Sequence, residues 1–311
     1  MRRVIWLIAI LLVLLGLVIG GWLLARGPAP SPYVADAVVD SPYWSEHDRL
    51  IDIDGVTLRV RETGPENAQP VLLIHGFSYS LESWEAWAQT LDDTYRVIRF
   101  DLPGHGLSGP DPDNAYAVSD TVEVLDGLIT ALDLNNTVLV GNSLGGLVAW
   151  RYTADNPDRV ARLALLAPGG YSINGVTEEP VAVPVAVSFY LRSAPLPMVQ
   201  GATARLFGDA SRMPDGMSER VRDLMLPQAD ALIARLEQFT LPDPEADLAR
   251  ISRPVLLIWG ERDVMVPVDH GERMLAVIPD AELIRFTDLG HVPHEEAPAD
   301  TLDDLLVFME E

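Results

Sequence analysis

A serine with the surroundings of a nucleophile lies in the run Gly141-Asn142-Ser143-Leu144-Gly145. Residues Thr137 to Val140 before it have the pattern of a short apolar strand, and Leu144 to Asp155 after it have helical spacing. A serine at so tight a strand-to-helix turn is lifted clear of the sheet, beside a helix N-terminus whose partial positive charge favours an oxyanion. A glycine-rich turn with a capping serine is the structural alternative, but this context favours Ser143 as a nucleophile.

A serine hydroxyl is a weak nucleophile unless a base accepts its proton, and histidine is the usual base. His291 follows the predicted strand Glu282 to Phe286, on a loop in which Gly290 permits a sharp approach. A loop after the last strand can fold back over the nucleophile. His294, three residues further on, is the alternative base, or else a histidine that anchors the loop or lies at the surface. We expect His291 to be the base.

An imidazole base needs a carboxylate that fixes its tautomer and stabilises its charged form. Asp263 lies just past the predicted strand Val255 to Trp259, at the strand end where parallel sheets carry their ligands. Glu261 could take its place, whereas Asp288 shares a loop with His291 and cannot easily turn back onto the ring. A surface salt bridge is the structural alternative for Asp263, and orientation of the base is the favoured role.

Acyl transfer through a tetrahedral intermediate needs two preorganised hydrogen-bond donors for the oxyanion. The backbone N–H of Leu144, directly after the nucleophile, is one candidate. The second is the N–H of Phe77, in the loop that follows the predicted strand Val71 to Ile74. His75 and Gly76 are then expected to shape this loop rather than to react.

The elements that must position these groups alternate between apolar strands and helices, which indicates a mostly parallel sheet buried on both faces. A hairpin precedes them, because Asp54-Gly55 separates two strand patterns. The predicted strands are Leu50 to Ile53, Val56 to Arg61, Val71 to Ile74, Val97 to Phe100, Thr137 to Val140, Leu163 to Leu166, Val255 to Trp259 and Glu282 to Phe286. The predicted helices are Leu81 to Leu91, Asp120 to Leu132 (with an Asp120/Glu123 capping pair) and Leu144 to Asp155.

The alternation stops between about Gly169 and Pro244, where the chain is rich in Pro and Met and predicts several short helices without strands. An insertion at the carboxyl ends of a parallel sheet lies where ligands bind, so we interpret it as a cap. Its large apolar residues could line an acyl pocket, but we expect most of them to form the core of the cap. They are Phe189, Tyr190, Met198, Phe207, Met213, Met217 and Met225.

Together these stretches resemble the α/β-hydrolase superfamily, in the branch of carboxylesterases, meta-cleavage-product hydrolases and epoxide hydrolases. The likeness covers about Leu50 to Glu310. It implies an eight-stranded sheet with a helical cap between strands six and seven, and the chain order Ser143, Asp263, His291. Epoxide hydrolases and haloalkane dehalogenases carry an aspartate nucleophile, in contrast to Ser143. Meta-cleavage-product hydrolases usually have an oxyanion loop richer in Gly and Pro than His75-Gly76-Phe77-Ser78-Tyr79-Ser80.

We therefore expect hydrolysis of carboxylic esters with a small to medium apolar acyl group, through an acyl-enzyme. No metal or organic cofactor is implied, and the absence of cysteine excludes a cysteine nucleophile and disulfides. Hydrolysis of a carbon–carbon bond and perhydrolase chemistry are the alternatives, since both use the same triad. A binding module is disfavoured because it has no need of all three groups together. A lipase of membrane lipids is made plausible by the N-terminal segment described next, but the acidic body does not support it.

Residues Val4 to Ala25 form an uncharged run of 22 residues. As a helix this run would measure about 33 Å, enough to cross a bilayer. We expect an uncleaved signal anchor in residues 1–26, with Arg2 and Arg3 keeping the N-terminus cytoplasmic and the body outside the cytoplasm, which is the periplasm if the cell is Gram-negative. Cleavage and secretion are the alternative. A Pro-rich tether is expected at 27–44, a hydrolase core at 45–170 and 244–311, and the cap at 171–243.

The body is strongly acidic. The chain of 311 residues has a net charge of −24. Three of its 22 basic residues lie within positions 1–26, where there is no acidic residue, so positions 27–311 carry −27. Such a surface repels nucleic acid, which we exclude as a partner.

Overall fold

The computed structural model describes residues 33, 35–173 and 175–310. Within them the chain forms one eight-stranded sheet in the order β1-β2-β4-β3-β5-β6-β7-β8. Strand β2 pairs antiparallel with β1 and with β4, and all other neighbours are parallel. The strands are β1 (Asp48–Ile53), β2 (Val56–Thr63), β3 (Pro70–Ile74), β4 (Arg96–Phe100), β5 (Thr137–Asn142), β6 (Val160–Leu166), β7 (Val255–Gly260) and β8 (Ala281–Phe286). This confirms the predicted mostly parallel sheet.

The predicted hairpin is present at the edge of the sheet, where β1 and β2 pair from Ile53–Val56 to Asp48–Arg61. Its two turn residues both have a positive φ, 51° at Asp54 and 90° at Gly55. Two consecutive residues with φ > 0 define the turn whose twist matches that of the flanking strands, which is why Asp-Gly is favoured there.

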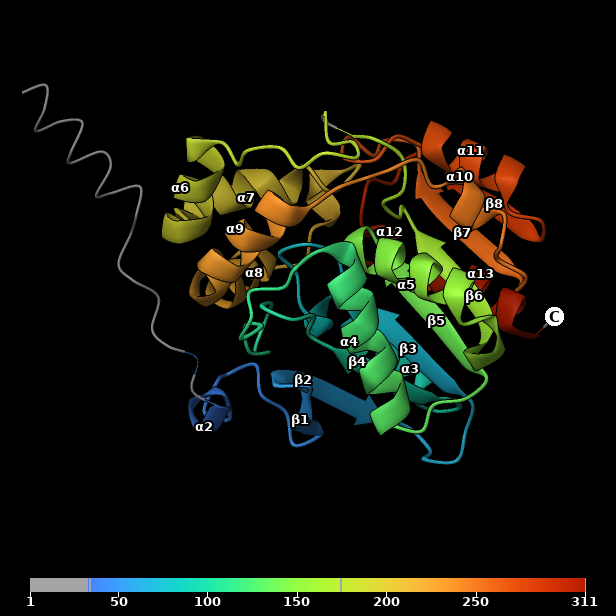
Figure 1. The fold of residues 1–311 in the computed structure, drawn as a ribbon, viewed down its shortest axis with the longest axis horizontal. Coiled ribbons are helices and arrows are strands. Elements are labelled where there is room, and N and C mark those ends of the chain that lie inside the picture. The colour runs from blue at the N-terminus through green and yellow to red at the C-terminus, as the bar shows by residue number, and fades with distance from the viewer. Residues whose placement is uncertain (1–32, 34, 174, 311) are drawn as a thin grey trace, which may run out of the picture.

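Both faces of the sheet are covered by helices, as a continuous apolar strand pattern requires (Figure 1). In β3, Val71 and Leu73 join an apolar cluster on one face, and Leu72 and Ile74 join the cluster on the other. The first face is covered by α3 (Glu85–Leu91) and α13 (Pro298–Glu310), and the second by α4 (Val118–Ala131), α5 (Leu144–Asp155) and α11 (Asp269–Val277).

The helix predicted to begin at Asp120 begins at Val118 instead. The Asp120 carboxylate accepts a hydrogen bond of 2.8 Å from the N–H of Ala117, the residue before the helix. Asp120 therefore caps the helix from its third position, and the predicted pairing with Glu123 is wrong. The predicted helix over Leu81 to Leu91 is divided, because Leu81–Trp84 is a 3₁₀ helix that leads into α3.

Between β6 and β7 the described residues of 171–243, which we call the insertion, form α6 (Val185–Ser193), α7 (Leu196–Ala204), α8 (Met217–Met225) and α9 (Ala229–Gln238). Their only β pairing is an isolated bridge between Ile173 and Val176. Figure 1 shows these helices gathered on one side of the sheet. Phe207, Met217 and Met225 are buried in an apolar cluster made mostly of residues of the insertion, whereas Met198 is 46% exposed.

The predicted anchor at 1–26 lies outside the described residues. Among the helices that the structure does describe, none combines the length and the apolar character needed to cross a membrane. Part of the segment predicted as an extended tether is folded, since α2 spans Ala35–Val38. This segment also contacts the body: Tyr33 donates a hydrogen bond of 3.3 Å to the Leu107 carbonyl, and the Tyr43 carbonyl accepts one of 3.0 Å from Arg61.

Candidate functional site

The turn between β5 and α5 holds Ser143 in a strained backbone conformation, with φ 53° and ψ −114°. The two flanking glycines are required by close backbone contacts. A Cβ at Gly141 would lie 2.4 Å from the Gly145 carbonyl oxygen, and a Cβ at Gly145 would lie 2.2 Å from that of Ile74. The glycine spacing around the serine is thus a consequence of how tightly the turn packs.

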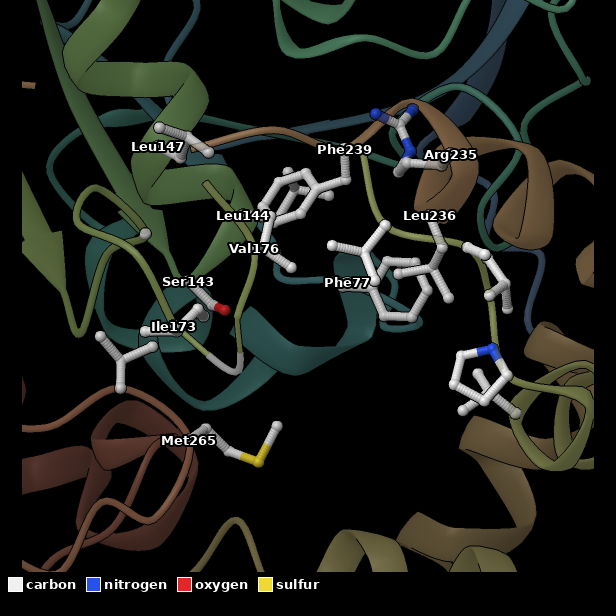
Figure 2. Close-up of a pocket in the computed structure, with 17 residues that line it drawn as sticks. Phe77, Ser143, Leu144, Leu147, Ile173, Val176, Arg235, Leu236, Phe239 and Met265 are labelled. Atoms are coloured by element: carbon white, nitrogen blue, oxygen red, sulfur yellow. The ribbon is translucent and has the colours of Figure 1, made fainter. Parts of the chain in front are cut away.

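Three backbone hydrogen bonds fix the position of Ser143. Its N–H donates to Leu166, and its carbonyl accepts from Leu147 and Gly169, each at 3.0 Å. Its hydroxyl has no hydrogen-bond partner within the described part of the chain and faces open space (Figure 2). A strained, anchored backbone that presents the hydroxyl at the end of the sheet is the arrangement that serine nucleophiles show.

His291 and Asp263, which follow two different strands, meet in the structure. Nδ1 of His291 lies 2.7 Å from Oδ2 of Asp263, and both residues are less than 10% exposed. The other carboxylate oxygen, Oδ1, accepts backbone hydrogen bonds from Met265 at 2.7 Å and Val266 at 3.0 Å. The loop after β7 therefore fixes the carboxylate, which in turn orients the ring.

The other candidates for base and acid are occupied elsewhere. His294 is 1% exposed and stacks on Trp84 with ring centroids 4.1 Å apart, so the alternative of a surface histidine is wrong. Burial lowers the pKa of His294 to about 3, which keeps the ring neutral. Glu261 pairs with Arg285 at 2.9 Å, and Asp288 pairs with Arg212.

Two backbone donors border the serine. The N–H groups of Phe77 and Leu144 donate no hydrogen bond to any residue that the structure describes, and both residues line the space in front of Ser143. The Phe77 loop is held by His75, whose Nε2 accepts a hydrogen bond of 3.0 Å from the N–H of Leu102. Burial lowers the pKa of His75 to about 4, so the ring is neutral.

Asn142 is a site residue that the sequence reasoning missed. Its side-chain amide donates hydrogen bonds of 3.0 Å to the carbonyls of Leu166 and of His291. It therefore links the end of β6 to the loop of the candidate base. Its place beside Ser143 was the available signal, because a polar residue at the end of a buried strand needs partners.

Ser143, Phe77 and Met265 lie where two cavities meet. The first has a volume of about 480 Å³ and is walled mainly by apolar side chains of the insertion, among them Val176, Val187, Leu236 and Phe239. The second, of about 500 Å³, is lined by His291, Tyr79, Tyr190 and Leu206. The serine and the histidine thus border a common space, and Tyr190 is the one predicted pocket residue that lines it.

Among the residues that the structure describes, Arg235 is the single charged one on the wall of the first cavity. Its terminal nitrogens are bound elsewhere, Nη1 to the Thr121 hydroxyl at 2.7 Å and Nη2 to the Pro103 carbonyl at 3.1 Å. Its Nε has no partner in the described chain but is sealed from solvent. Figure 2 shows the guanidinium pointing away from the cavity. The first cavity therefore offers a bound molecule apolar contacts and no available cation.

The fold and this arrangement define an α/β hydrolase, and residues 71–304 match the alpha/beta hydrolase family. The chain belongs to this family. It is 29% identical over 245 residues to a 2-hydroxy-6-oxononadienedioate/2-hydroxy-6-oxononatrienedioate hydrolase of Cupriavidus pinatubonensis, covering 75% of this chain and 84% of that protein.

Two solved structures show the same fold. A membrane phospholipase A superposes with a TM-score of 0.75 at 23% identity, covering 100% of this chain and 98% of the other. The 2-hydroxy-6-oxo-6-phenylhexa-2,4-dienoate hydrolase of Rhodococcus sp. strain RHA1 superposes with a TM-score of 0.74 at 22% identity, covering 85% and 98%.

Proposed function

We propose that the protein hydrolyses carboxylic esters with an apolar acyl group through a Ser143–His291–Asp263 triad. The observation that carries this proposal is the hydrogen-bonded pair of His291 and Asp263 at a cavity shared with Ser143. The apolar wall of the adjoining cavity of about 480 Å³ suits a hydrocarbon chain rather than a charged substrate.

In this mechanism His291 accepts the proton of the Ser143 hydroxyl as the oxygen attacks the acyl carbon. Asp263 holds the Nδ1 proton and stabilises the imidazolium that forms. The N–H groups of Phe77 and Leu144 donate to the oxyanion, and the N-terminus of α5 adds its partial positive charge. His291 then protonates the leaving alcohol and activates the water that releases the acid.

Carbon–carbon bond hydrolysis is the second candidate, because the relative from Cupriavidus pinatubonensis is named for that class of substrate. A substrate named as a dioate carries two carboxylates, and each needs a cation or several hydrogen-bond donors when it is bound. Among the described residues on the wall of the first cavity, Arg235 is the one cation, and it is bound to Thr121 and Pro103. The first cavity therefore favours the apolar acyl group of an ester, whereas Arg205 on the second cavity is the cation that a carboxylate of a dioate would use.

The decisive experiment is turnover by the full-length chain in detergent of p-nitrophenyl esters of increasing acyl length, beside Ser143→Ala. We expect Ser143→Ala to lose about three or more decades of rate. Ser119→Ala, which removes an exposed hydroxyl on α4, should retain the wild-type rate. Equal rates for wild type and Ser143→Ala would refute the esterase. Turnover of a 2-hydroxy-6-oxo-dienoate but of no ester would select the second candidate.

We further propose that residues 1–26 anchor the protein and that the catalytic body lies outside the cytoplasm. The 22 uncharged residues from Val4 to Ala25, with Arg2 and Arg3 before them, support this placement. N-terminal sequencing of the protein recovered from washed membranes tests it. A mature N-terminus beyond Ala25, or recovery in the soluble fraction, would contradict it.

A phospholipid should be added to the series of test substrates, because one of the structurally similar proteins is named a membrane phospholipase A.

A further inference from the structure

We propose that Glu296 is a positioning residue that places His291 by joining its loop to the insertion. This inference rests on the proposed role of His291 as the base. Glu296 lies five residues after His291, in the short helix α12 (Pro293–Glu296), and is 6% exposed. It touches neither Ser143 nor the space in which a substrate binds, so it acts through the backbone around it.

The Glu296 carboxylate gathers three backbone N–H groups from two separate segments. Oε2 accepts hydrogen bonds from Gly290 at 2.7 Å and from Gly208 at 2.8 Å, and Oε1 accepts one from Asp209 at 2.8 Å. Gly290 directly precedes His291, whereas Gly208 and Asp209 belong to the insertion. One buried side chain thus ties the loop of the base to the insertion.

The two backbones are in direct contact at this point. The N–H of His291 donates a hydrogen bond of 2.6 Å to the Leu206 carbonyl. A Cβ at Gly290 would lie 2.4 Å from that same oxygen, and one at Gly208 would lie 2.3 Å from the Asp288 carbonyl oxygen. The contact therefore admits only glycine at both positions. With the loop so close to the insertion, a shift of either segment must move the other.

The Glu296 carboxylate is held mainly by hydrogen bonds from backbone amides, and pairing with a cation contributes less. The nearest cation, Arg212, lies 3.7 Å from Oε1 and also pairs with Asp288. The three amides satisfy the carboxylate, as buried carboxylates require. A glutamine in its place offers one acceptor oxygen and an NH₂ group that would face N–H donors. Glu296→Gln therefore keeps the shape of the side chain and loses one or more of the three bonds.

The consequence concerns catalysis. Leu206, from the insertion, and His291 line the same cavity of about 500 Å³. Because Glu296 links their segments, the wall that contacts a substrate and the imidazole that activates Ser143 are positioned together. A displacement of a catalytic group by about 1 Å can cost about 10²-fold in rate. Loss of the link should thus reduce kcat while the apolar cavity that binds the acyl chain is kept.

The test compares Glu296→Gln with Glu295→Gln in the full-length chain. Glu295 is the matched control because it is the adjacent buried glutamate, but it bonds to Arg220 of α8 at 3.2 Å and to no amide of the His291 loop. We expect Glu296→Gln to lower kcat about 10- to 100-fold with KM within about threefold of wild type. Labelling of Ser143 by a fluorophosphonate should slow by the same factor, whereas Glu295→Gln should stay within about threefold in both.

Equal kcat and labelling rates for the two variants, or a raised KM with unchanged kcat, would overturn the inference. If Glu296→Gln does not fold, the inference can be tested by hydrogen exchange of the wild-type protein. The peptides that carry 206–209 and 288–292 should be protected to the same degree, and unequal protection would count against a shared carboxylate. A wild type that a fluorophosphonate does not label at Ser143 would instead refute the proposed function.

Discussion

At the scale of single residues, the turn around Ser143 depends on space that only glycine leaves. The backbones of Gly141 and Gly145 approach neighbouring carbonyl oxygens so closely that a methyl group fits at neither position. The sequence motif could be recognised because this geometry admits few residue types. The partners of Asn142 and Glu296 could not be predicted, because Asn142 bonds to the carbonyl of His291, more than a hundred residues away, and Glu296 bonds to a segment of the insertion.

Gly145→Ala should destabilise the fold by at least about 2 kcal/mol and abolish ester turnover, because its Cβ would lie 2.2 Å from the Ile74 carbonyl oxygen. Urea unfolding measures the change. Gly201→Ala is the control, since Gly201 lies in α7 with nothing within 4 Å of the added methyl. It should raise stability by about 0.4–1 kcal/mol. Similar stability of the two variants would contradict the steric account.

Asp263→Asn should lower kcat by roughly three to four decades while thermal stability changes little. The amide oxygen keeps the place of Oδ1, which accepts from the N–H groups of Met265 and Val266, so the NH₂ group replaces Oδ2, 2.7 Å from Nδ1 of His291. This NH₂ group donates to Nδ1, so the ring proton moves to Nε2 and the ring can no longer accept the proton of Ser143. Steady-state kinetics with the best p-nitrophenyl ester checks this. Asp288→Asn, on the loop of His291 but paired with Arg212, should retain activity.

At the scale of elements, the strands could be predicted because alternation and burial are local properties of the sequence. All eight predicted strands fall within observed ones, with ends that differ by a few residues. Helix starts were less certain, as α4 shows, because Asp120 can cap from inside the helix as well as from its end. The cavity wall was not foreseen. Val176, Val187, Leu236 and Phe239 come together only when the insertion packs, and nothing in their local pattern distinguishes a wall from a core.

Val187→Phe should shorten the preferred acyl chain. Val187 lies on α6 and lines the cavity of about 480 Å³, so a larger ring takes up room that a long chain needs. We expect KM for octanoyl and longer esters to rise several-fold, with acetyl and butyryl esters unaffected. Val185→Phe, on the same helix but 73% exposed, is the control. An unchanged chain-length profile in Val187→Phe would place the acyl group elsewhere.

At the scale of the whole molecule, stability should depend on pH through the buried Glu295. Burial raises the pKa of Glu295 from 4.5 to about 7, although the Arg220 guanidinium opposes the shift. Between these two values the Glu295 carboxyl binds more protons in the folded protein than in the unfolded chain, so its contribution to stability falls as pH rises through this range. Below about pH 4.5 this contribution no longer changes with pH.

Glu295→Gln should therefore remove this contribution, so that Tm between about pH 5 and pH 8 falls less, or rises more, with pH than in the wild type, because the amide does not ionise. Differential scanning fluorimetry across this range measures the slope. Glu66→Gln, at an exposed position in the loop before β3, should keep the wild-type slope. If the slopes of Glu295→Gln and wild type coincide, Glu295 does not contribute to the pH dependence in this range.

The short stretch from Tyr33 to Trp44 decides where the protein can be shortened. The Tyr43 carbonyl accepts hydrogen bonds from Arg59 and Arg61, and Arg59 is fully buried against Asp48, Glu82 and Asp101. A fragment beginning at Ser45 would strip an acceptor from two arginines at the sheet edge and expose their charge cluster to water. A fragment beginning at residue 33 keeps the Tyr43 carbonyl and therefore its hydrogen bonds to both arginines. A truncated form of this hydrolase should therefore begin before β1, within the segment that the sequence predicts as a tether.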